Sequence, residues 1–246
     1  MPNDVKNRIW FGGPWEKVQA VLRQIAVEDI DWEGTIDFNK IIPMPEELGI
    51  EDGSSTHIAM CAYLTMINPQ TKDRGVEKYA EPRYNTIKTV LVNEYEWGGV
   101  SDNMTDEDFE MISMSRDRYI CIGERVVDNV EKYGASTWFH WRMENWGTKW
   151  NAYDTEAGDD NELVFCTAWK APHPVIEKLA KMNPELVIRH EWADEDTGHN
   201  CGSRIYKDGA LKDEYTPDGG TEEAISLSRS VWGEDEDEAY WVDKLI

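Results

Sequence analysis

The segment Trp138–Asp154 carries four of the chain's twelve tryptophans and constrains the fold more than any other stretch. Large residues alternate from Trp138 to Trp141, which predicts a strand with both faces covered. Gly147 stands between two tryptophans, and a glycine in that place indicates a bend that residues with a side chain tolerate poorly. We therefore expect the flanking indole rings to fold onto a common centre.

Two interpretations of this segment remain open. The first is a turn that anchors the core, because a tryptophan buries a large area and needs one partner for its indole N–H. The second is a ligand-binding or enzymatic site with indole walls and a few polar groups. The candidate residues of that site are Glu144, Asn145, Trp146, Lys149, Trp150 and Asn151.

The N-terminal part of the chain follows a strand–helix–strand order. Val5–Phe11 is typical of a strand, and Trp15–Ile25 has the single apolar stripe of a helix. Thr35–Ile42 is expected to form the second strand. Residues 46–134 are then expected to form a helical insertion. Its predicted helices are Thr56–Met66, Tyr84–Tyr95, one that begins at Thr105, and Tyr119–Tyr133, which stops at Gly134.

A second strand–helix–strand unit follows the tryptophan-rich segment. Leu163–Trp169 and Leu186–Trp192 alternate as strands do, and Val175–Met182 between them has helical spacing. Asp208-Gly209 is the residue pair most typical of a two-residue hairpin turn. The two hairpin strands would be Cys201–Lys207 and Ala210–Tyr215.

The order of these elements predicts an α+β protein with a ferredoxin-like split βαβ sheet. The helical insertion would follow the second strand, and the hairpin would be added at the C-terminal side. We expect residues 1–246 to form a single domain in which residues 216–246 are an acidic C-terminal extension.

The charge of the chain restricts its partners. A formal net charge of −24 over 246 residues repels the phosphates of nucleic acids and attracts basic proteins, so direct nucleic-acid binding is disfavoured. There is no run of about 18 apolar residues, and the N-terminus lacks a secretory pattern. We therefore expect a cytoplasmic protein without membrane contact. The sequence does not specify the oligomeric state.

The sequence predicts no cofactor, metal site or catalytic set. The four cysteines are scattered without a CxxC pair, as is typical of free thiols in a reducing compartment. His190, His199 and Cys201 are close in sequence, but their spacing does not require them to converge on one metal ion. With 49 acidic residues, no catalytic carboxylate pair can be singled out.

Four segments carry a family resemblance. They are Met1-Pro2-Asn3 with Asn7, Ile42–Leu48, Glu144–Asn151 with its Asn-Trp-Gly-Thr-Lys-Trp block, and Thr167-Ala168-Trp169 followed by Pro172, Pro174, Val175 and Ile176. In this order they resemble the phage and plasmid proteins with a YubB-type ferredoxin-like domain, the Api92-like family. The resemblance implies a βαββαβ topology without a cluster, a mobile-element setting and no established activity. Lys170-Ala171 departs from the family pattern, which has a serine and a further proline there.

The function we expect is that of a non-enzymatic binding protein acting on a host protein with a basic surface. Carboxylates on a rigid fold can imitate the phosphates of a duplex, as in an anti-defence or DNA-mimic role. The candidate acidic surface is Glu234, Asp235, Glu236, Asp237 and Glu238. Acidity also keeps a protein soluble, which is a second explanation of the charge. The alternative function is the small-ligand or enzymatic site at the Trp146–Trp150 turn.

Overall fold

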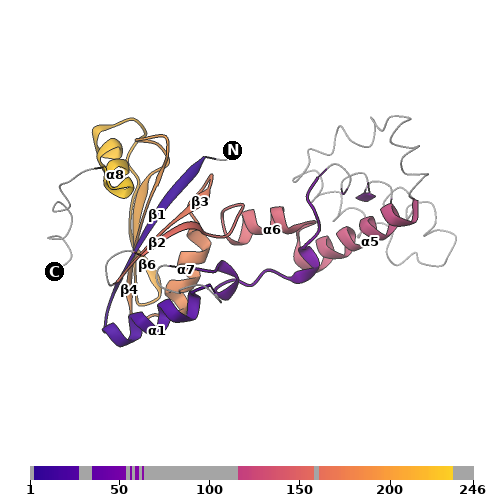
Figure 1. Ribbon diagram of the computed structural model, residues 1–246, viewed down its shortest axis with the longest axis horizontal. Helices are drawn as coiled ribbons and strands as arrows, with labels where there is room; N and C mark the ends of the chain where they lie inside the picture. The colour runs from indigo at the N-terminus through magenta and orange to yellow at the C-terminus, as the bar shows by residue number, and fades with distance from the viewer. Residues whose placement is uncertain are drawn as a thin grey trace. The chain divides into compact units, whose positions relative to one another are not determined.

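The computed structural model describes residues 3–27, 35–53, 56, 59–60, 63, 116–157 and 161–234 (Figure 1). The chain divides into two compact units, each of which is described by itself. The first unit joins Met1–Pro43 to Arg142–Ile246, and the second comprises Met44–Trp141. The predicted helical insertion, residues 46–134, falls within the second unit.

Within the described residues, the first unit is built on a six-stranded antiparallel sheet with the order β2-β3-β1-β4-β5-β6. The strands are β1 (Asp4–Gly12), β2 (Tyr153–Ala157), β3 (Glu162–Ala168), β4 (Val187–Asp194), β5 (Gly202–Lys207) and β6 (Ala210–Tyr215). The first four strands have the order of a ferredoxin-like sheet, and β5 and β6 extend it as a hairpin beside β4. The predicted fold class is therefore confirmed.

β1 is the central strand and joins the early and late parts of the chain in one sheet. It pairs with β3 on one side, where Asn7 lies opposite Phe165, and with β4 on the other, where Asn7 lies opposite Trp192. Its alternate residues Val5, Asn7 and Ile9 are buried, so one face of the strand is directed into the core.

The second strand of the sheet is Tyr153–Ala157, so the prediction of a strand at Thr35–Ile42 is wrong. The Asp37 carboxylate accepts the Asn39 N–H at 2.9 Å and begins a turn, and Phe38–Lys40 forms the 3-10 helix η1. The insertion accordingly precedes the second strand instead of following it. β2 was missed because it is an edge strand with polar residues and no apolar alternation.

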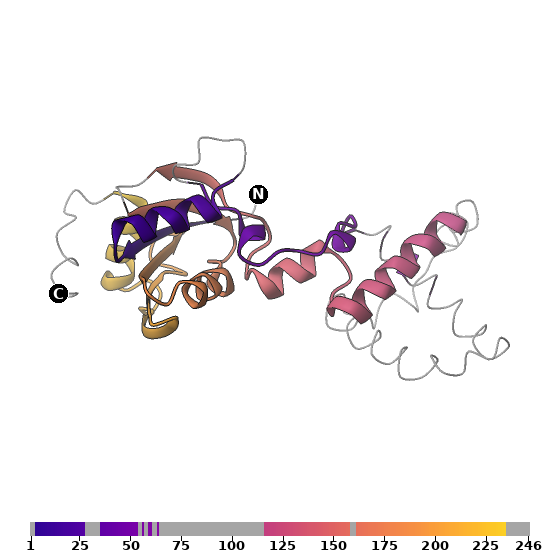
Figure 2. The same cartoon turned by 90° about the horizontal axis from the view of Figure 1, so that it is seen from below.

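Helices cover both faces of the sheet, as Figure 1 shows. The predicted helices are present as α1 (Trp15–Ile25) and α7 (His173–Met182), and a further helix, α8 (Glu222–Trp232), lies in the acidic C-terminal extension. Figure 2 shows α1 beside η1, whose Phe38 meets the ring of Phe165 in β3 at a centroid distance of 5.9 Å. The His173 ring of α7 meets Trp192 of β4 at 4.4 Å. α1, η1 and α7 therefore lie over the same face.

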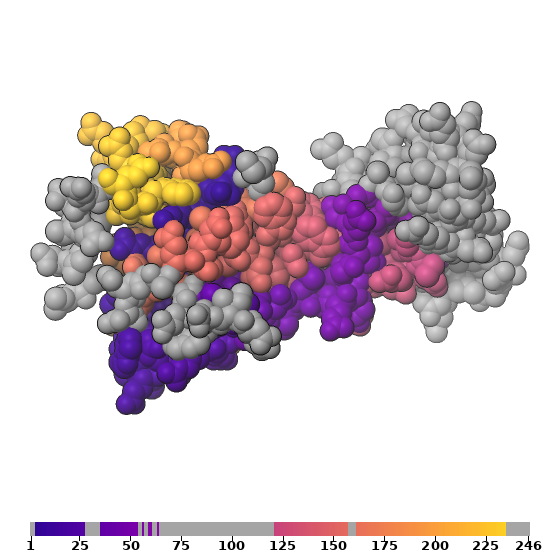
Figure 3. All heavy atoms as spheres, viewed as in Figure 1, coloured from indigo at the N-terminus to yellow at the C-terminus, as the bar shows by residue number. Residues whose placement is uncertain are grey.

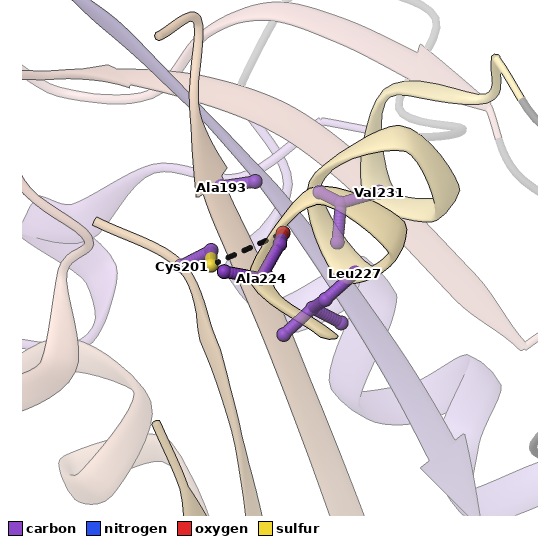
Figure 4. Packing of buried hydrophobic residues seen from close by; sticks show 5 residues of the cluster. All are labelled: Ala193, Cys201, Ala224, Leu227 and Val231. Carbon is purple, nitrogen blue, oxygen red and sulfur yellow. Dashed lines mark hydrogen bonds between the residues drawn. The ribbon is translucent and has the colours of Figure 1, made fainter. Parts of the chain in front are cut away.

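α8 packs on the opposite face. Figure 4 shows Leu227 and Val231 of this helix against Ala193, the residue that follows Trp192 in β4 and therefore points to the other side of the sheet. The Cys201 thiol donates to the Ala224 carbonyl at 3.6 Å across the same contact. This packing holds the loop between β4 and β5 against the N-terminal end of α8.

The prediction of a strand at Trp138–Trp141 is also wrong, because these residues begin the helix α6 (Trp138–Asn145). The Thr137 carbonyl accepts the Trp141 N–H at 3.3 Å. A run of four large residues is too short to separate a helical period from a strand period. The predicted bend at Gly147 is confirmed, since its φ is +79° and its N–H donates to the Arg142 carbonyl at 3.1 Å.

The second unit contains the predicted long helix, α5 (Arg116–Tyr133), which is followed by Gly134 with φ of +73°. The Asn129 amide of this helix donates to the Glu47 carbonyl at 2.9 Å, and Lys132 pairs with the Glu47 carboxylate. Glu47 belongs to the 3-10 helix η2 (Glu46–Leu48). These contacts attach the start of the unit to α5.

The other predicted helices of the insertion are only partly described. Thr56, Ala59, Met60 and Tyr63 are helical, in agreement with the helix predicted for Thr56–Met66. The helices predicted for Tyr84–Tyr95 and after Thr105 lie outside the described residues. In the part of the chain that the structure describes, no helix has both the length and the apolar character needed to cross a membrane.

Candidate functional site

Trp146, the central residue of the predicted site, belongs to the core. Its side chain is fully buried, and its indole N–H donates to the Ile42 carbonyl at 2.9 Å. Its ring meets Phe38 edge-on at a centroid distance of 5.6 Å. A tryptophan with both its ring and its N–H engaged in this way anchors the fold.

The residues after Trp146 fix the turn to α7 and β3. A Cβ added to Gly147 would lie 2.9 Å from Cδ of Pro174, so only glycine allows this approach. The buried Thr148 hydroxyl donates to the Ala168 carbonyl at 2.8 Å. The turn is therefore a rigid support for the residues that follow it.

Asn151 also serves the fold. Its amide oxygen accepts the Phe38 N–H at 2.9 Å, and its amide nitrogen donates to the Asp37 carboxylate at 2.8 Å. Glu144 is exposed near the end of α6, and Asn145 is half-buried as its last residue.

Lys149 and Trp150 lie on a surface that includes a third residue, Trp169. The Lys149 ammonium lies 5.1 Å from the ring centroid of Trp150 and 4.8 Å from that of Trp169. Trp150 is 37% exposed and Trp169 is 38% exposed. We call these three residues the Trp-Lys-Trp surface. It presents indole rings that hold a cation, and large aromatic side chains of this kind are common anchors of binding interfaces.

Trp169 has a left-handed backbone conformation, with φ of +69°. This conformation costs an L-residue about 1–2 kcal/mol and is an outlier for a bulky side chain. Hydrogen bonds hold it: the Trp169 N–H donates to the Asn3 carbonyl at 2.9 Å, and the Trp169 carbonyl accepts from the Asn200 amide at 3.2 Å. The Thr167 hydroxyl closes the turn by donating to the Lys170 carbonyl at 2.9 Å. Strained residues that are held in this way are concentrated at functional sites.

Trp169 was not among the predicted site residues, although the resemblance included it. Its pairing with Lys149 depends on the register of β3 against β1 and on the turn at Gly147, which no local pattern reveals. The available signal was a tryptophan placed directly after a buried strand, where the chain returns to solvent.

A second group of exposed residues is acidic. Five exposed carboxylates come from the loop after β4, the loop before α8 and the first turn of α8, and we call them the acidic rim. Its members are Glu195, Asp196, Asp218, Glu222 and Glu223. The Gly220 N–H donates to the Gly198 carbonyl at 2.9 Å and joins the two loops, and the Gly198 N–H donates to the side-chain hydroxyl of Ser228 in α8 at 2.9 Å.

Asp194 connects the acidic rim to Trp169. Its carboxylate accepts the Asp196 N–H at 3.0 Å and the Asn200 amide at 3.2 Å. The same Asn200 amide binds the Trp169 carbonyl. In Figure 3 the indigo start of β1 lies next to the orange and yellow segments that carry the rim. The loop that carries Glu195 and Asp196 is therefore bonded to the main chain of Trp169.

A tyrosine and a thiol lie near Trp150, and both are protonated at neutral pH. The Tyr153 hydroxyl donates to the Asp4 carboxylate, and burial together with this bond raises the pKa of Tyr153. Burial and the Asp4 carboxylate raise the pKa of the Cys166 thiol to about 11. A thiol in this state is a poor nucleophile. The pair therefore suits packing and hydrogen bonding better than catalysis.

A buried polar group lies in the core under α7. The Asn7 amide nitrogen donates to the Val5 carbonyl and to the Thr167 hydroxyl, both at 2.9 Å. The Asn7 amide oxygen is then an acceptor, so Nε2 of His190, 3.0 Å away, carries the proton. Nδ1 of His190 is left as a buried acceptor without a partner. Burial lowers the pKa of His190 well below its usual value, so the ring is neutral.

Two further candidate sites from the sequence are the metal site at His190, His199 and Cys201 and the acidic run Glu234–Glu238. His190 lies on the face under α7, whereas Cys201 packs under α8 on the opposite face, so these two do not share a site. Among the described residues, no group of three or more potential ligands could hold a metal ion. In the predicted acidic run, Glu234 is exposed after α8, and Asp235–Glu238 lie outside the described residues.

A family model of a ferredoxin-like domain agrees with the sheet. No curated protein matches the chain. A solved structure, protein api92 from Yersinia pseudotuberculosis, is similar at 10% sequence identity with a TM-score of 0.39, covering 90% of this chain and 100% of that chain. A phage or plasmid origin stays a prediction. Residues 145–238 match the family model described as "Ferredoxin-like domain in Api92-like protein", so this part of the chain is similar to the ferredoxin-like domain of that family.

Proposed function

We propose that this chain is a non-enzymatic binding protein of a mobile genetic element that acts on a host protein with a basic surface. The observation that carries this proposal is the acidic rim. Five exposed carboxylates are held on three adjoining segments, and none of them pairs with a basic side chain in the part of the chain that the structure describes. The mobile-element setting is taken from the resemblance to phage and plasmid proteins.

The charge around the rim favours a cationic partner. Residues 191–234 contain eleven acidic and four basic residues, a difference of −7. Arg204 pairs with Glu214, and Lys212 pairs with Asp208, so these bases are already engaged. The rim carboxylates therefore contribute their full negative field to an approaching protein. Such a field raises the rate of association with a basic partner and is screened by salt within about 8–10 Å.

The rigidity of the rim distinguishes a binding surface from charge that only aids solubility. The main chain of the rim segments is fixed by hydrogen bonds and by the packing of α8 on Ala193, and Figure 4 shows this packing. A preformed arrangement binds with less loss of conformational entropy than a flexible acidic tail. A DNA-mimic role is one form of this proposal, in which the partner's basic groove normally binds a duplex.

The test is a pull-down from host lysate at low and high salt with two matched variants. In the first, the rim is neutralised as E195Q, D196N, D218N, E222Q and E223Q. In the second, five exposed acids elsewhere in the first unit are neutralised as E16Q, D154N, E177Q, E185Q and D213N. Both variants change the net charge from −24 to −19. We expect salt-sensitive capture of a basic protein that only the rim variant loses.

Two outcomes would count against the proposal. Equal loss in both variants would mean that capture follows overall charge and that the rim has no special role. Capture that is insensitive to salt, or no capture at all, would contradict the proposal that the chain binds a basic protein. Thermal unfolding of both variants checks folding, because Glu222 and Glu223 also stabilise the first turn of α8.

A second candidate function is a small-ligand site at the Trp146–Trp150 turn, and the Trp-Lys-Trp surface favours it. Trp146 and Asn151 are committed to the fold, so Lys149 and Trp150 would act together with Trp169. An ammonium between two indole rings would suit a flat anionic ligand. A thermal-shift screen of aromatic carboxylates tests this candidate, and a shift that is lost in Lys149→Gln would support it.

A further inference from the structure

We propose that the first turn of α7 opens away from the sheet in mild acid, because two histidines at this contact take up protons when it opens. They are His173, the first residue of α7, and His190 of β4, and we call them the histidine pair. This inference goes beyond the proposed function, since it concerns how one part of the fold is held. It rests on the packing of the two rings, on their unpartnered nitrogens and on the charges around them.

His190 has no place for a second proton while α7 is packed on the sheet. Its Nε2–H donates to the Asn7 amide oxygen at 3.0 Å, so Nδ1 is the atom that a proton would join. The side chain is fully buried, and Nδ1 has no hydrogen-bond partner in the described part of the chain. Protonation in place would therefore bury both a charge and an unpaired donor, which costs free energy.

The rings at this contact pack as uncharged groups. His173 and His190 have ring centroids 5.6 Å apart, and the Trp192 ring lies 4.4 Å from the first and 5.3 Å from the second. Nδ1 of His173 is also buried and has no hydrogen-bond partner among the described residues. The contact between α7 and β4 is therefore one of ring packing, which favours neutral imidazoles.

Positive charge near the histidine pair opposes its protonation. His173 begins an α-helix, and the partial positive charge of a helix N-terminus disfavours a cation there. Arg204 of β5 lies opposite His190 in the sheet, and its guanidinium is 5.7 Å from the Trp192 ring. Burial is the main cause that lowers the pKa of both histidines, and Arg204 adds to it.

The other titratable groups at this contact leave the balance unchanged. Glu214 of β6 favours a charged His173, but its carboxylate is paired with Arg204. Tyr206 of β5 is buried, and burial raises its pKa, so its hydroxyl is neutral between pH 5 and pH 7. Glu177 of α7 is paired within its own helix. Mild acid therefore acts here through the histidine pair.

The link between proton uptake and opening is thermodynamic. In the open state the histidine rings meet water and regain a pKa near 6.5, whereas in the closed state the pKa of His173 is about 4. Both states are neutral above pH 6.5, so closure is complete there. Between pH 6.5 and pH 4 the open state binds protons that the closed state does not, so acid favours opening.

Opening of α7 should extend to the turn after α6. Pro174, the neighbour of His173, lies against Gly147, since a Cβ added to Gly147 would be 2.9 Å from Cδ of Pro174. Release of the first turn of α7 removes this support from the turn. α8 packs on the opposite face of the sheet, against Ala193, and keeps its contacts. The proposal therefore predicts a local change and not a uniform one.

The experiment is amide hydrogen exchange of the full chain at pH 7 and pH 5, expressed as protection factors so that the intrinsic effect of pH on exchange cancels. We expect the factors of Val175, Ile176 and Gly147, whose N–H groups donate to main-chain carbonyls, to fall by about twentyfold. Those of α8, such as Ile225, should change by less than about threefold.

Two variants connect the effect to the histidine pair. His173→Phe keeps a ring beside Trp192 but cannot take up a proton, so most of the acid-induced loss of protection should disappear. The matched control is the exposed His199→Gln, which should keep the loss of the parent chain. If the phenylalanine variant lacks the circular dichroism of the parent at pH 7, His173→Gln takes its place.

The outcomes decide the proposal. Equal loss of protection in α7 and α8 would show that acid destabilises the sheet as a whole, and it would overturn a local opening. Unchanged protection of α7 at pH 5 would mean that the rings take up protons without opening, which also overturns it. If the His173 variant keeps the loss, His190→Gln decides: this variant keeps an N–H donor for Asn7, and a loss that persists in it as well would exclude the histidine pair as the cause.

Discussion

The indole N–H of Trp146 donates to the main-chain carbonyl of Ile42 across 104 residues of sequence. This bond connects the turn after α6 with the segment that follows η1. The ring itself is fully buried against Phe38, which in turn meets Phe165 of β3. One side chain therefore joins the two parts of the chain that form the first unit.

Replacing Trp146 with phenylalanine should lower the free energy of unfolding by about 1–3 kcal/mol, because the Ile42 carbonyl loses its donor and the smaller ring leaves a void. Urea unfolding followed by circular dichroism measures the change. Trp150→Phe is the control, since Trp150 is 37% exposed and its replacement should change stability by less than about 0.5 kcal/mol. Equal effects of the two substitutions would contradict a core role for Trp146.

Gly147→Ala should destabilise the fold more than Gly220→Ala does. Both glycines have φ of +79°, so both alanine variants carry a backbone penalty of about 1 kcal/mol. Only at Gly147 does the added Cβ meet another group, Cδ of Pro174 at 2.9 Å, whereas nothing lies within 4 Å at Gly220. We expect a further loss of about 1–3 kcal/mol for Gly147→Ala, measured by thermal unfolding of both variants. Similar losses would mean that Pro174 moves aside.

Local patterns predicted most of the sheet because its inner strands carry clear apolar signals. β3 is buried from Leu163 to Ala168, and β1 alternates from Val5 to Phe11, so each shows a clear apolar signal. The hairpin was predicted from Asp208-Gly209, whose φ values of +55° and +72° fit the tight turn that this pair favours.

The wrong predictions fell where local pattern and tertiary context disagree. Thr35–Ile42 alternates like a strand, but the Asp37 side chain bonds the following backbone, and Asn151 stabilises the resulting turn from a distant segment. The true edge strand β2 has polar residues that give no periodic signal. In the candidate site, Lys149 and Trp150 were predicted from their turn, whereas Trp169 joins them only through the packing of β3.

Trp169→Asn should be more stable than Trp169→Ala by about 0.5–1 kcal/mol. Both substitutions remove the same indole, but asparagine enters the left-handed region more easily than alanine. The comparison isolates the backbone strain at φ of +69° from the packing of the ring. Denaturant midpoints of the two variants provide the measurement. A less stable asparagine variant would show that the turn at Trp169 is not strained.

The half-buried His173 and the buried His190 should make the fold less stable as the pH falls below about 6.5. Burial, with a smaller contribution from the charge of Arg204 and an opposing one from Glu214, lowers the pKa of His173 from 6.5 to about 4. Between these values the unfolded chain binds a proton that the folded chain does not, so stability is complete above pH 6.5 and is lost toward pH 4. From about pH 7 to about pH 5 the loss from His173 is at most about 2 kcal/mol. His190, whose ring lies 5.6 Å from that of His173, adds to the loss in the same direction.

Urea unfolding across this pH range tests the effect with His173→Gln and, as a control, the exposed His199→Gln. Glutamine cannot take up the proton, so the His173 variant should show a flatter dependence of stability on pH than the parent chain. The His199 variant should keep the slope of the parent, because its ring lies outside the group formed by His173, His190 and Trp192. Parallel curves for all three proteins would mean that His173 contributes nothing to the acid sensitivity.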